Sequence, residues 1–211
     1  MLADEFLPVY DVSDSVATVV HADLTATWNA LMHVDLIDVG RRRPLVAALG
    51  ALRALPDIAS HILHGEVPQG APPHLRLTDL SEIPMGKGGW ILLGNQPQDE
   101  IAFGLVGKFW RPVIEFAEVS RDDFVAFDRP GFAKTIYSLA VHRIGEAQTL
   151  LSGTMRTATT DEPARKWFRR YWSFGVGSGA HVLVNGLIDV VREDAESSPT
   201  RDGIRIAANA T

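Results

Sequence analysis

The sequence predicts an α+β fold in which a curved antiparallel sheet wraps around a long C-terminal helix and leaves a central cavity. Apolar residues recur at helical spacing near both ends of the chain and at alternating spacing between residues 74 and 159. A strand, helices, a series of strands and a long helix follow one another, which is typical of an α+β layer arrangement. Glycines interrupt the apolar face of the last helix, although each costs about 1 kcal/mol relative to alanine there.

The first elements of the chain are predicted from residue type and from capping. Residues 16–23 are rich in β-branched side chains and favour a strand. A short helix over residues 24–34 follows, with Asp23 or Thr25 as its N-cap. The sequence therefore predicts that the chain enters its first helix directly from its first strand.

The middle of the chain changes from helical to extended periodicity. Residues 43–65 predict two helical pieces divided at Pro56, and the Pro- and Gly-rich residues 66–73 predict a loop. After this loop the apolar period falls to 2, and turn residues separate the runs. Antiparallel strands are predicted over residues 74–80, 89–95, 99–110, 124–128, 133–144 and 147–159. The turn "RIGEAQ" between the last two strands indicates a β-hairpin.

The final helix is predicted to start at Thr159, which fits a capping box with Glu162 just before Pro163 in the first turn. A chain of 211 residues can bury one sizeable core, so one domain is the expected organisation. We expect this domain to span residues 1–194, with residues 195–211 as a flexible tail.

Composition and charge exclude several classes of protein. Hydrophobic residues make up 46% and charged residues 22%, as in an ordinary globular protein. The net charge of −6 gives no global field that would attract nucleic acid or anionic lipid. Aromatics are not interleaved with a basic strip, so nucleic-acid binding is not expected. For the basic run at residues 41–43, a solvated loop or helix start is favoured over an anion-binding patch. The chain has no cysteine, which excludes disulfides, thiolate metal sites and cysteine nucleophiles.

Targeting signals are not evident in the sequence. The N-terminus "MLADEFLPVYD" lacks the basic start and apolar core of a secretory signal. No apolar run approaches the ~20 residues that span a bilayer. We therefore expect a cytoplasmic protein without a membrane span.

The sequence does not match the familiar catalytic and cofactor-binding motifs. "GKGG" lacks the Ser or Thr of a P-loop, "GVGSG" lacks the spacing of a dinucleotide fingerprint, and no nucleophile elbow occurs. His61 and His64 with Glu66 could form a metal-binding face, but a third convincing ligand is missing. We expect no cofactor and no metal.

Three stretches carry a resemblance to a known superfamily. They are "ATVVHADLTATWNAL", "FGLVGKFWRP" followed by strands, and "FRRYWSFGVGSG" in the last helix. Over residues 14–194 the chain resembles the START/Bet v 1-like (SRPBCC) superfamily, which implies a helix-grip fold with a cavity between sheet and helix. Members include lipid carriers, hormone receptors, polyketide cyclases and chaperone activators, so the resemblance alone does not define a function.

A helical wheel of the last helix indicates on which face its glycines lie. Gly175, Gly179 and Gly186 share a buried stripe with Phe168 and Trp172, at 100° per residue. Glycine on such a stripe either opens volume for a ligand or allows tight packing or a kink in the helix. Both interpretations remain open at this point.

The remaining residues of the same helix differ in direction from this stripe. Gly177 points away from it, and Val184 and Ile188 lie on the back of the helix. The back of the helix could meet a second copy of the chain, so a homodimer is one expectation.

Apolar faces of the predicted strands complete the candidate cavity wall, as a pocket for a hydrophobic molecule requires. Gly153 leaves a gap between large residues on its strand, and the alternative is that these side chains simply fill the core. The predicted ligand-binding residues are Trp90, Phe103, Trp110, Tyr137, Leu139, Leu151, Gly153, Met155, Phe168, Trp172, Gly175 and Gly179.

Acid–base candidates are scattered and nothing in the sequence pairs them. In order of preference they are Asp35, Asp128 and His21, although a surface or structural role is the commoner one for each. The favoured function is binding of a hydrophobic or amphipathic small molecule, lipid- or polyketide-like. The alternatives are a polyketide cyclase- or dehydratase-like enzyme and an interaction domain with a vestigial cavity.

Overall fold

The computed structural model describes residues 1–51, 73–82 and 89–198. The helices are α1 (Leu2–Phe6), α2 (Leu24–His33), α3 (Leu36–Arg42), the 3₁₀ helix η1 (Leu77–Glu82), α5 (Glu162–Tyr171), the π-helical turn η2 (Trp172–Val176) and α6 (Gly177–Ser197). The strands are β1 (Val12–Val20), β2 (Ile91–Gln96), β3 (Glu100–Gly107), β4 (Ala133–Gly145) and β5 (Gln148–Thr159). Residues 44–51 are also helical.

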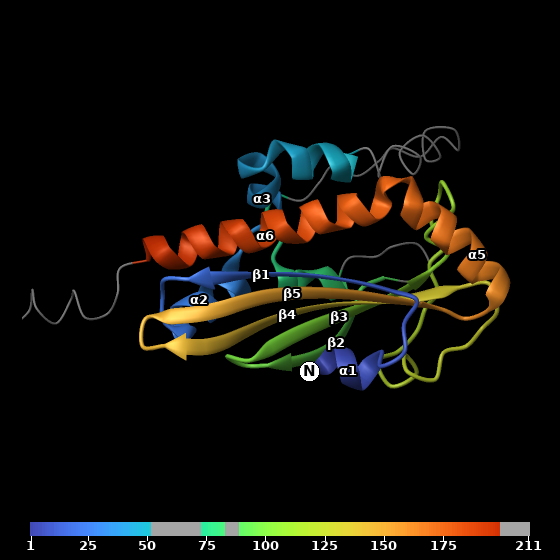
Figure 1. Ribbon diagram of the computed structural model, residues 1–211, viewed down its shortest axis with the longest axis horizontal. Coiled ribbons are helices and arrows are strands. Elements are labelled where there is room, and N and C mark those ends of the chain that lie inside the picture. The colour runs from blue at the N-terminus through green and yellow to red at the C-terminus, as the bar shows by residue number, and fades with distance from the viewer. Residues whose placement is uncertain (52–72, 83–88, 199–211) are drawn as a thin grey trace, which may run out of the picture.

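The strands form one antiparallel sheet in the order β1-β5-β4-β3-β2. Figure 1 shows α6 lying along one face of this sheet. Beyond the bend, α5 lies at an angle to α6 and reaches one end of the sheet. A curved antiparallel sheet with a long C-terminal helix across it is the helix-grip arrangement, and the predicted fold class is confirmed. The first strand, β1, pairs with the last, β5, along its whole length: Val12 lies opposite Thr157 and Val20 opposite Thr149.

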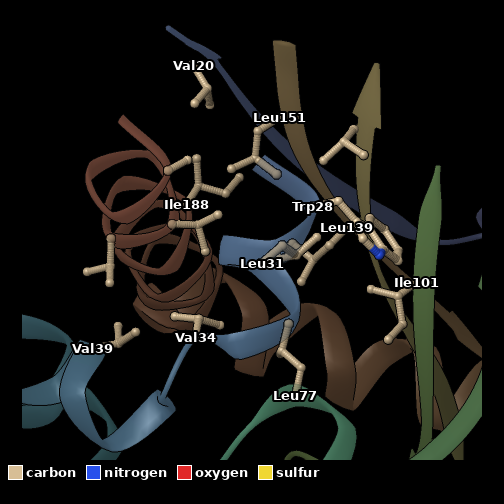
Figure 2. Packing of buried hydrophobic residues seen from close by; sticks show 14 of the residues in the cluster. Val20, Trp28, Leu31, Val34, Val39, Leu77, Ile101, Leu139, Leu151 and Ile188 are labelled. Atoms are coloured by element: carbon tan, nitrogen blue, oxygen red, sulfur yellow. The ribbon is translucent and has the colours of Figure 1, made fainter. Parts of the chain in front are cut away.

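One end of the space between sheet and α6 is filled by a hydrophobic core. Figure 2 shows side chains of this cluster, among them Ile188 of α6, Trp28 and Leu31 of α2 and Leu151 of β5. Leu31 and Leu151 are fully buried and Ile188 is 1% exposed. Each such aliphatic side chain contributes about 1.5–3 kcal/mol when it leaves water. This packing holds α6 at its C-terminal half.

The other face of the sheet is covered by α1, which the sequence did not predict. Phe6 of α1 packs with Phe124 and Ile136 in a second core cluster. The backbone amide of Leu2 donates a hydrogen bond of 2.6 Å to the buried carboxylate of Glu100. This contact attaches the N-terminus to the sheet.

Two of the predicted strands are wrong. Residues 77–82 form η1, because Leu77 and Leu80 point inward at a spacing of three and Asp79 accepts a hydrogen bond from the Arg76 amide. Residues 124–128 lie in turns and irregular chain: Phe124 is fully buried while Val125 is 52% exposed. Short apolar runs of this kind do not distinguish a strand from a turn that buries one large side chain.

Three predicted boundaries also shift. The first strand starts at Val12 and ends at Val20, ahead of the predicted 16–23. The N-cap of α5 is Asp161, whose carboxylate accepts from the Ala164 amide at 2.7 Å, so the capping box at Thr159 is wrong. The helix α6 continues to Ser197, where a tail was predicted, and Ala195 is 1% exposed. The break at Pro56, most of the loop 66–73 and residues 199–211 lie outside the described residues.

The basic run at residues 41–43 has a structural partner. Arg42 donates to Asp194 and Glu193, each at 2.6 Å, and Arg43 also pairs with Glu193. These ion pairs join the end of α3 to the C-terminal part of α6. In Figure 1, α3 and the helix at residues 44–51 lie on the side of α6 away from the sheet. Two arginines of the run therefore attach this layer to α6.

The long C-terminal helix is bent. Phe174 and Gly175 have non-helical backbone angles, and the φ of +92° at Gly175 is left-handed, which glycine adopts without steric cost. In the described chain, the helical segment Glu162–Ser197 is long and apolar enough by length and composition to cross a membrane. Core helices of soluble proteins meet the same criterion, and the C-terminal half of this segment packs on the sheet.

Candidate ligand-binding pocket

A pocket of about 720 Å³ lies between the sheet and the bend of the C-terminal helix. Its floor comes from β3, β4 and β5, and its walls come from the chain after β3 and from the α5–η2–α6 bend. The lining residues are Leu49, Trp90, Leu105, Phe109, Trp110, Arg111, Pro112, Ile114, Phe116, Thr135, Tyr137, Met155, Thr157, Phe168, Tyr171, Trp172, Phe174, Gly175, Val176, Gly179, Ala180 and Leu183. The volume is within the range of small-molecule sites.

Aromatic side chains make up much of the wall and orient one another. The rings of Phe168 and Trp172 are 5.8 Å apart between centroids, and those of Trp90 and Tyr137 are 5.5 Å apart in an edge arrangement. Such pairs are favourable by about 0.5–1.5 kcal/mol beyond their burial. The wall is therefore apolar and its aromatic rings are held in place by their neighbours.

Neutral hydroxyl groups supply the polar part of the floor. Thr135 and Thr157 lie directly opposite each other on β4 and β5, and their hydroxyls form a hydrogen bond of 2.8 Å. Burial, and secondarily the nearby Tyr171, raises the pKa of Tyr137 to about 12. Its phenol therefore stays protonated at neutral pH, and within the described chain its hydroxyl has no hydrogen-bond partner. A ligand with an acceptor atom could take this free O–H.

A single charged side chain lines the pocket in the part of the chain that the structure describes. Arg111 is 56% exposed and lies 3.6 Å from the carboxylate of Glu115. No Asp, Glu, His or Lys belongs to the described lining. The pocket is thus suited to a mostly apolar molecule with hydrogen-bonding groups.

The structure brings most of the predicted ligand-binding residues to this pocket. Those on its lining are Trp90, Trp110, Tyr137, Met155, Phe168, Trp172, Gly175 and Gly179. The others belong to the core: Phe103, Leu139 and Leu151 are 2%, 6% and 0% exposed. All three belong to the hydrophobic cluster that also contains Ile188 of α6.

Gly153 shows that the alternative interpretation, tight packing, holds at one position. A Cβ there would lie 2.6 Å from Val184 Cγ1 and 3.1 Å from Ile188 Cδ1. The gap predicted at Gly153 is filled by α6. Val184 and Ile188 therefore face the sheet, and the prediction that they lie on a free back of the helix is wrong. The expectation of a homodimer stays a prediction.

The helix glycines divide into two groups. A Cβ at Gly179 would meet only Leu49, at 3.9 Å, and one at Gly175 would meet nothing within 4 Å. In contrast, a Cβ at Gly186 would lie 2.5 Å from Val46, because this glycine packs against the helix at residues 44–51. Gly179 and Gly186 are seven residues apart in α6 and lie on the same side of it, toward the helix at residues 44–51, so in α6 the predicted stripe does not face the sheet.

The acid–base candidates lie apart from the pocket and from one another. Asp35 caps α3 and accepts hydrogen bonds from the Ile37 and Leu75 amides, at 2.9 and 3.1 Å, and pairs with His74 at 2.7 Å. These contacts, His74 first, lower the pKa of Asp35 to about 2. Asp128 is exposed, and His21 lies in a separate polar groove beside α2.

Metal ligation finds no support in the described chain. No group of three or more His, Asp or Glu side chains there could hold an ion. His61, His64 and Glu66 lie outside the described residues.

Sequence reasoning missed two groups of lining residues. Thr135 and Thr157 continue the alternation that starts at Tyr137 and Met155, so the period of 2 could have found them. The chain after β3, which contributes Phe109 and other apolar residues, has no period that could show its direction.

Comparisons with known proteins concern the fold alone. No protein-family model and no curated protein matches the sequence. A conserved protein from Geobacillus kaustophilus aligns with a TM-score of 0.39 and 12% identity, over 89% of this chain and 97% of that chain. The Zhui aromatase/cyclase from Streptomyces sp. R1128 aligns with a TM-score of 0.31 and 10% identity, over 89% and 97%. A point mutant of norcoclaurine synthase from Thalictrum flavum aligns with a TM-score of 0.32 and 10% identity, over 88% and 98%.

Proposed function

We propose that this protein binds an apolar or amphipathic small molecule in the pocket between the sheet and the α5–η2–α6 bend. The observation that carries the proposal is the pocket itself, a volume of about 720 Å³ with aromatic walls and few polar groups. Apolar walls supply affinity through burial, and a few placed polar groups fix orientation. The helix-grip arrangement and the resemblance to START/Bet v 1-like proteins agree with this role.

The polar groups on the floor narrow the class of ligand. Tyr137 has a free phenol O–H, and the hydroxyls of Thr135 and Thr157 lie on the neighbouring part of the floor. A ligand with a carbonyl or hydroxyl oxygen at its inner end would accept from Tyr137, whereas a pure hydrocarbon would leave this donor unpaired. Lipid-like and polyketide-like molecules both have such oxygens.

The enzyme alternative, a cyclase- or dehydratase-like activity, has no specific observation in its favour. General acid–base catalysis needs a titratable group within hydrogen-bond reach of the substrate. Asp35, Asp128 and His21 are not on the described lining, and Tyr137 remains protonated at neutral pH. Binding is therefore the function that the geometry supports best.

Tryptophan fluorescence tests the proposal directly. Trp90, Trp110 and Trp172 line the pocket, whereas Trp28 is in the core and Trp167 is outside the lining. Titration with a long-chain fatty acid or an aromatic polyketide should quench or shift the emission saturably.

Matched tryptophan variants give the control. Trp90→Phe and Trp172→Phe should each remove part of the saturable signal, while Trp28→Phe should leave it in place. Native mass spectrometry of freshly purified protein should also detect a bound small molecule. If no member of a broad ligand panel gives a saturable change and nothing co-purifies, binding in this pocket is wrong.

A further inference from the structure

An exposed face beside the pocket mouth combines aromatic and basic side chains. We call it the α5 outer face and define it by Lys166, Trp167, Arg169, Arg170 and Phe174. Trp167 is 55% exposed and Phe174 is 88% exposed, although both are large aromatic residues. Lys166, Arg169 and Arg170 are exposed as well.

The amphipathic pattern of α5 creates this face. Ala164 and Phe168 point to the sheet side and are each 2% exposed. At 100° per residue, Lys166 and Arg170 then fall on the opposite side of the helix, and Trp167 lies on the flank beside Arg170. Phe174 follows in η2, just before the left-handed Gly175, and is also exposed.

The charges of this face lack acidic partners. In the described chain, the side chains of Lys166 and Arg169 have no hydrogen bond or ion pair. The guanidinium of Arg170 lies over the ring of Trp167, 5.3 Å from its centroid. The neighbouring Arg165, by comparison, pairs with Asp11 and Glu162. These positive charges are unneutralised on a chain whose net charge is −6. Positive charge gathered on one face without acidic partners favours contact of this face with an anionic surface.

The aromatic residues indicate which anionic surface fits. Single-stranded nucleic acid also stacks on exposed aromatic rings beside basic side chains, but the apolar pocket that Phe174 borders suits acyl chains. An exposed Trp and Phe beside basic side chains therefore fit a bilayer interface best. Phe174 belongs both to this face and to the pocket lining, together with Gly175. A membrane touching the α5 outer face would thus lie at the entrance of the pocket.

We propose that the α5 outer face docks on an anionic lipid bilayer. Lys166, Arg169 and Arg170 contact the lipid headgroups, and Trp167 and Phe174 enter the interfacial layer. The pocket mouth then opens toward the acyl region, from which an apolar ligand can enter without crossing water. This last step rests on the proposed binding function, while docking itself does not.

Vesicle binding tests the proposal. The intact protein should co-sediment with vesicles of phosphatidylcholine and phosphatidylglycerol at low salt and bind far less to phosphatidylcholine alone. Raising the salt should release it, because screening shortens the reach of the charges. The Lys166→Gln/Arg170→Gln double variant should weaken binding by about tenfold or more, since each basic residue near an anionic surface contributes substantially. Phe174→Ser should weaken it by about tenfold through lost apolar burial.

The β4–β5 hairpin offers a matched control at the opposite end of β5. Arg143 and Ile144 are both exposed there, Ile144 at 52%. The Arg143→Gln and Ile144→Ser variants should bind vesicles like the unmodified protein. Equal losses at the two ends, or no binding to anionic vesicles at low salt, would overturn the proposal. Self-association that depends on Phe174 without vesicle binding would also overturn it.

The two proposals fail separately. The Lys166→Gln/Arg170→Gln variant should still bind a soluble fatty acid with the tryptophan signal of the unmodified protein, because neither residue lines the pocket. Loss of vesicle binding with intact ligand binding in this variant supports the docking role. Vesicle binding by a protein that binds no ligand would support docking and contradict the pocket function.

Discussion

At the residue scale, Asp35 and Tyr137 show how the surroundings of a titratable group decide its role. Asp35 accepts three hydrogen bonds, two of them from backbone amides, and this stabilises its ionised form. Tyr137 lies among apolar side chains, and burial stabilises its neutral form. The first residue is therefore structural, and the second is a hydrogen-bond donor available to a ligand.

Removing the Asp35 carboxylate should destabilise the fold without affecting the pocket. Asp35→Ala should cost about 1 kcal/mol, the typical loss of an N-cap. Asp35→Asn should cost less, because an amide oxygen can still accept from Ile37 and Leu75. Urea unfolding measures both. A variant that is stable but has lost ligand binding or catalytic activity would contradict this structural role.

The carboxylate of Asp35 should make the free energy of unfolding depend on pH in the acid range. The folded-state pKa of Asp35, about 2, is below its ordinary value of 3.8. Its contribution is therefore fully present above about pH 4 and is lost as the pH falls toward 2. The stability difference between the unmodified protein and Asp35→Asn should narrow over this range.

Tyr137 should produce the opposite dependence, at high pH. Its folded-state pKa of about 12 lies above the ordinary value of 10, so the folded state retains a proton that the unfolded state loses. Its contribution to stability is complete below pH 10 and falls between pH 10 and 12, by up to about 2–3 kcal/mol. Tyr137→Phe should lose less stability over this range. Parallel curves for the two proteins would contradict the buried phenol.

At the element scale, the C-terminal helix has two functions in its two halves. From Val184 onward, α6 packs tightly on the sheet, where the missing side chain of Gly153 leaves room for Val184 and Ile188. The N-terminal half, after the bend at Gly175, leaves the sheet and borders the pocket. Glycines serve close packing in one half and open space in the other, so the residue type alone does not distinguish the two.

Leucine substitutions at two glycines of α6 should have opposite effects. Gly179→Leu should keep or raise the melting temperature, because glycine is the poorer helix former by about 1 kcal/mol and a Cβ meets only Leu49. The new side chain should also weaken ligand binding about tenfold or more by occupying pocket volume.

Gly186→Leu is the matched control. Its Cβ would collide with Val46, so overpacking should cost about 1–3 kcal/mol while the pocket remains open. Thermal unfolding and fluorescence titration separate the two results. A marked drop in melting temperature for both Gly179→Ala and Gly179→Leu would show that Gly179 does not face open space.

At the scale of the whole molecule, packing is uneven along the sheet. The core of α2, η1 and the C-terminal half of α6 closes one end, and Arg42 and Arg43 attach α3 to α6 beside it. The other end holds the pocket between strands and the helix bend. Rigid packing at one end therefore supports an open space at the other.

Ligand binding should stabilise the whole molecule if the pocket belongs to the folded state alone. A ligand at a hundred times its Kd should add about 2.7 kcal/mol to the free energy of unfolding. The melting temperature should rise with ligand concentration, and the rise should be smaller in Gly179→Leu than in the unmodified protein at the same concentration. A ligand that changes the fluorescence but not the melting temperature would not be binding the folded pocket.

Local chemistry was enough to predict much of this architecture. The change of period from 3.6 to 2, the hairpin "RIGEAQ" and the cap at Asp23 are properties of neighbouring residues, and they led to the α+β class and to β3, β4 and β5. Alternation along β4 and β5 also identified Tyr137 and Met155 on the pocket side. Such signals survive folding because the side chain direction in a strand depends only on the backbone.

Contacts between distant segments decided the rest. A helical wheel assumes one continuous helix, but this chain bends at Gly175. Before the bend Phe168 is buried toward the sheet, and after it Val184 and Ile188 face the sheet while Gly186 faces Val46. The role of Asp35 depended on His74 and Leu75, about forty positions away in the sequence. The extent of the pocket depended on the point at which α6 separates from the sheet. By itself the sequence determined the elements and their apolar faces. Only the tertiary structure decided which of those faces meet and which enclose space, because that depends on the packing of side chains from separate elements.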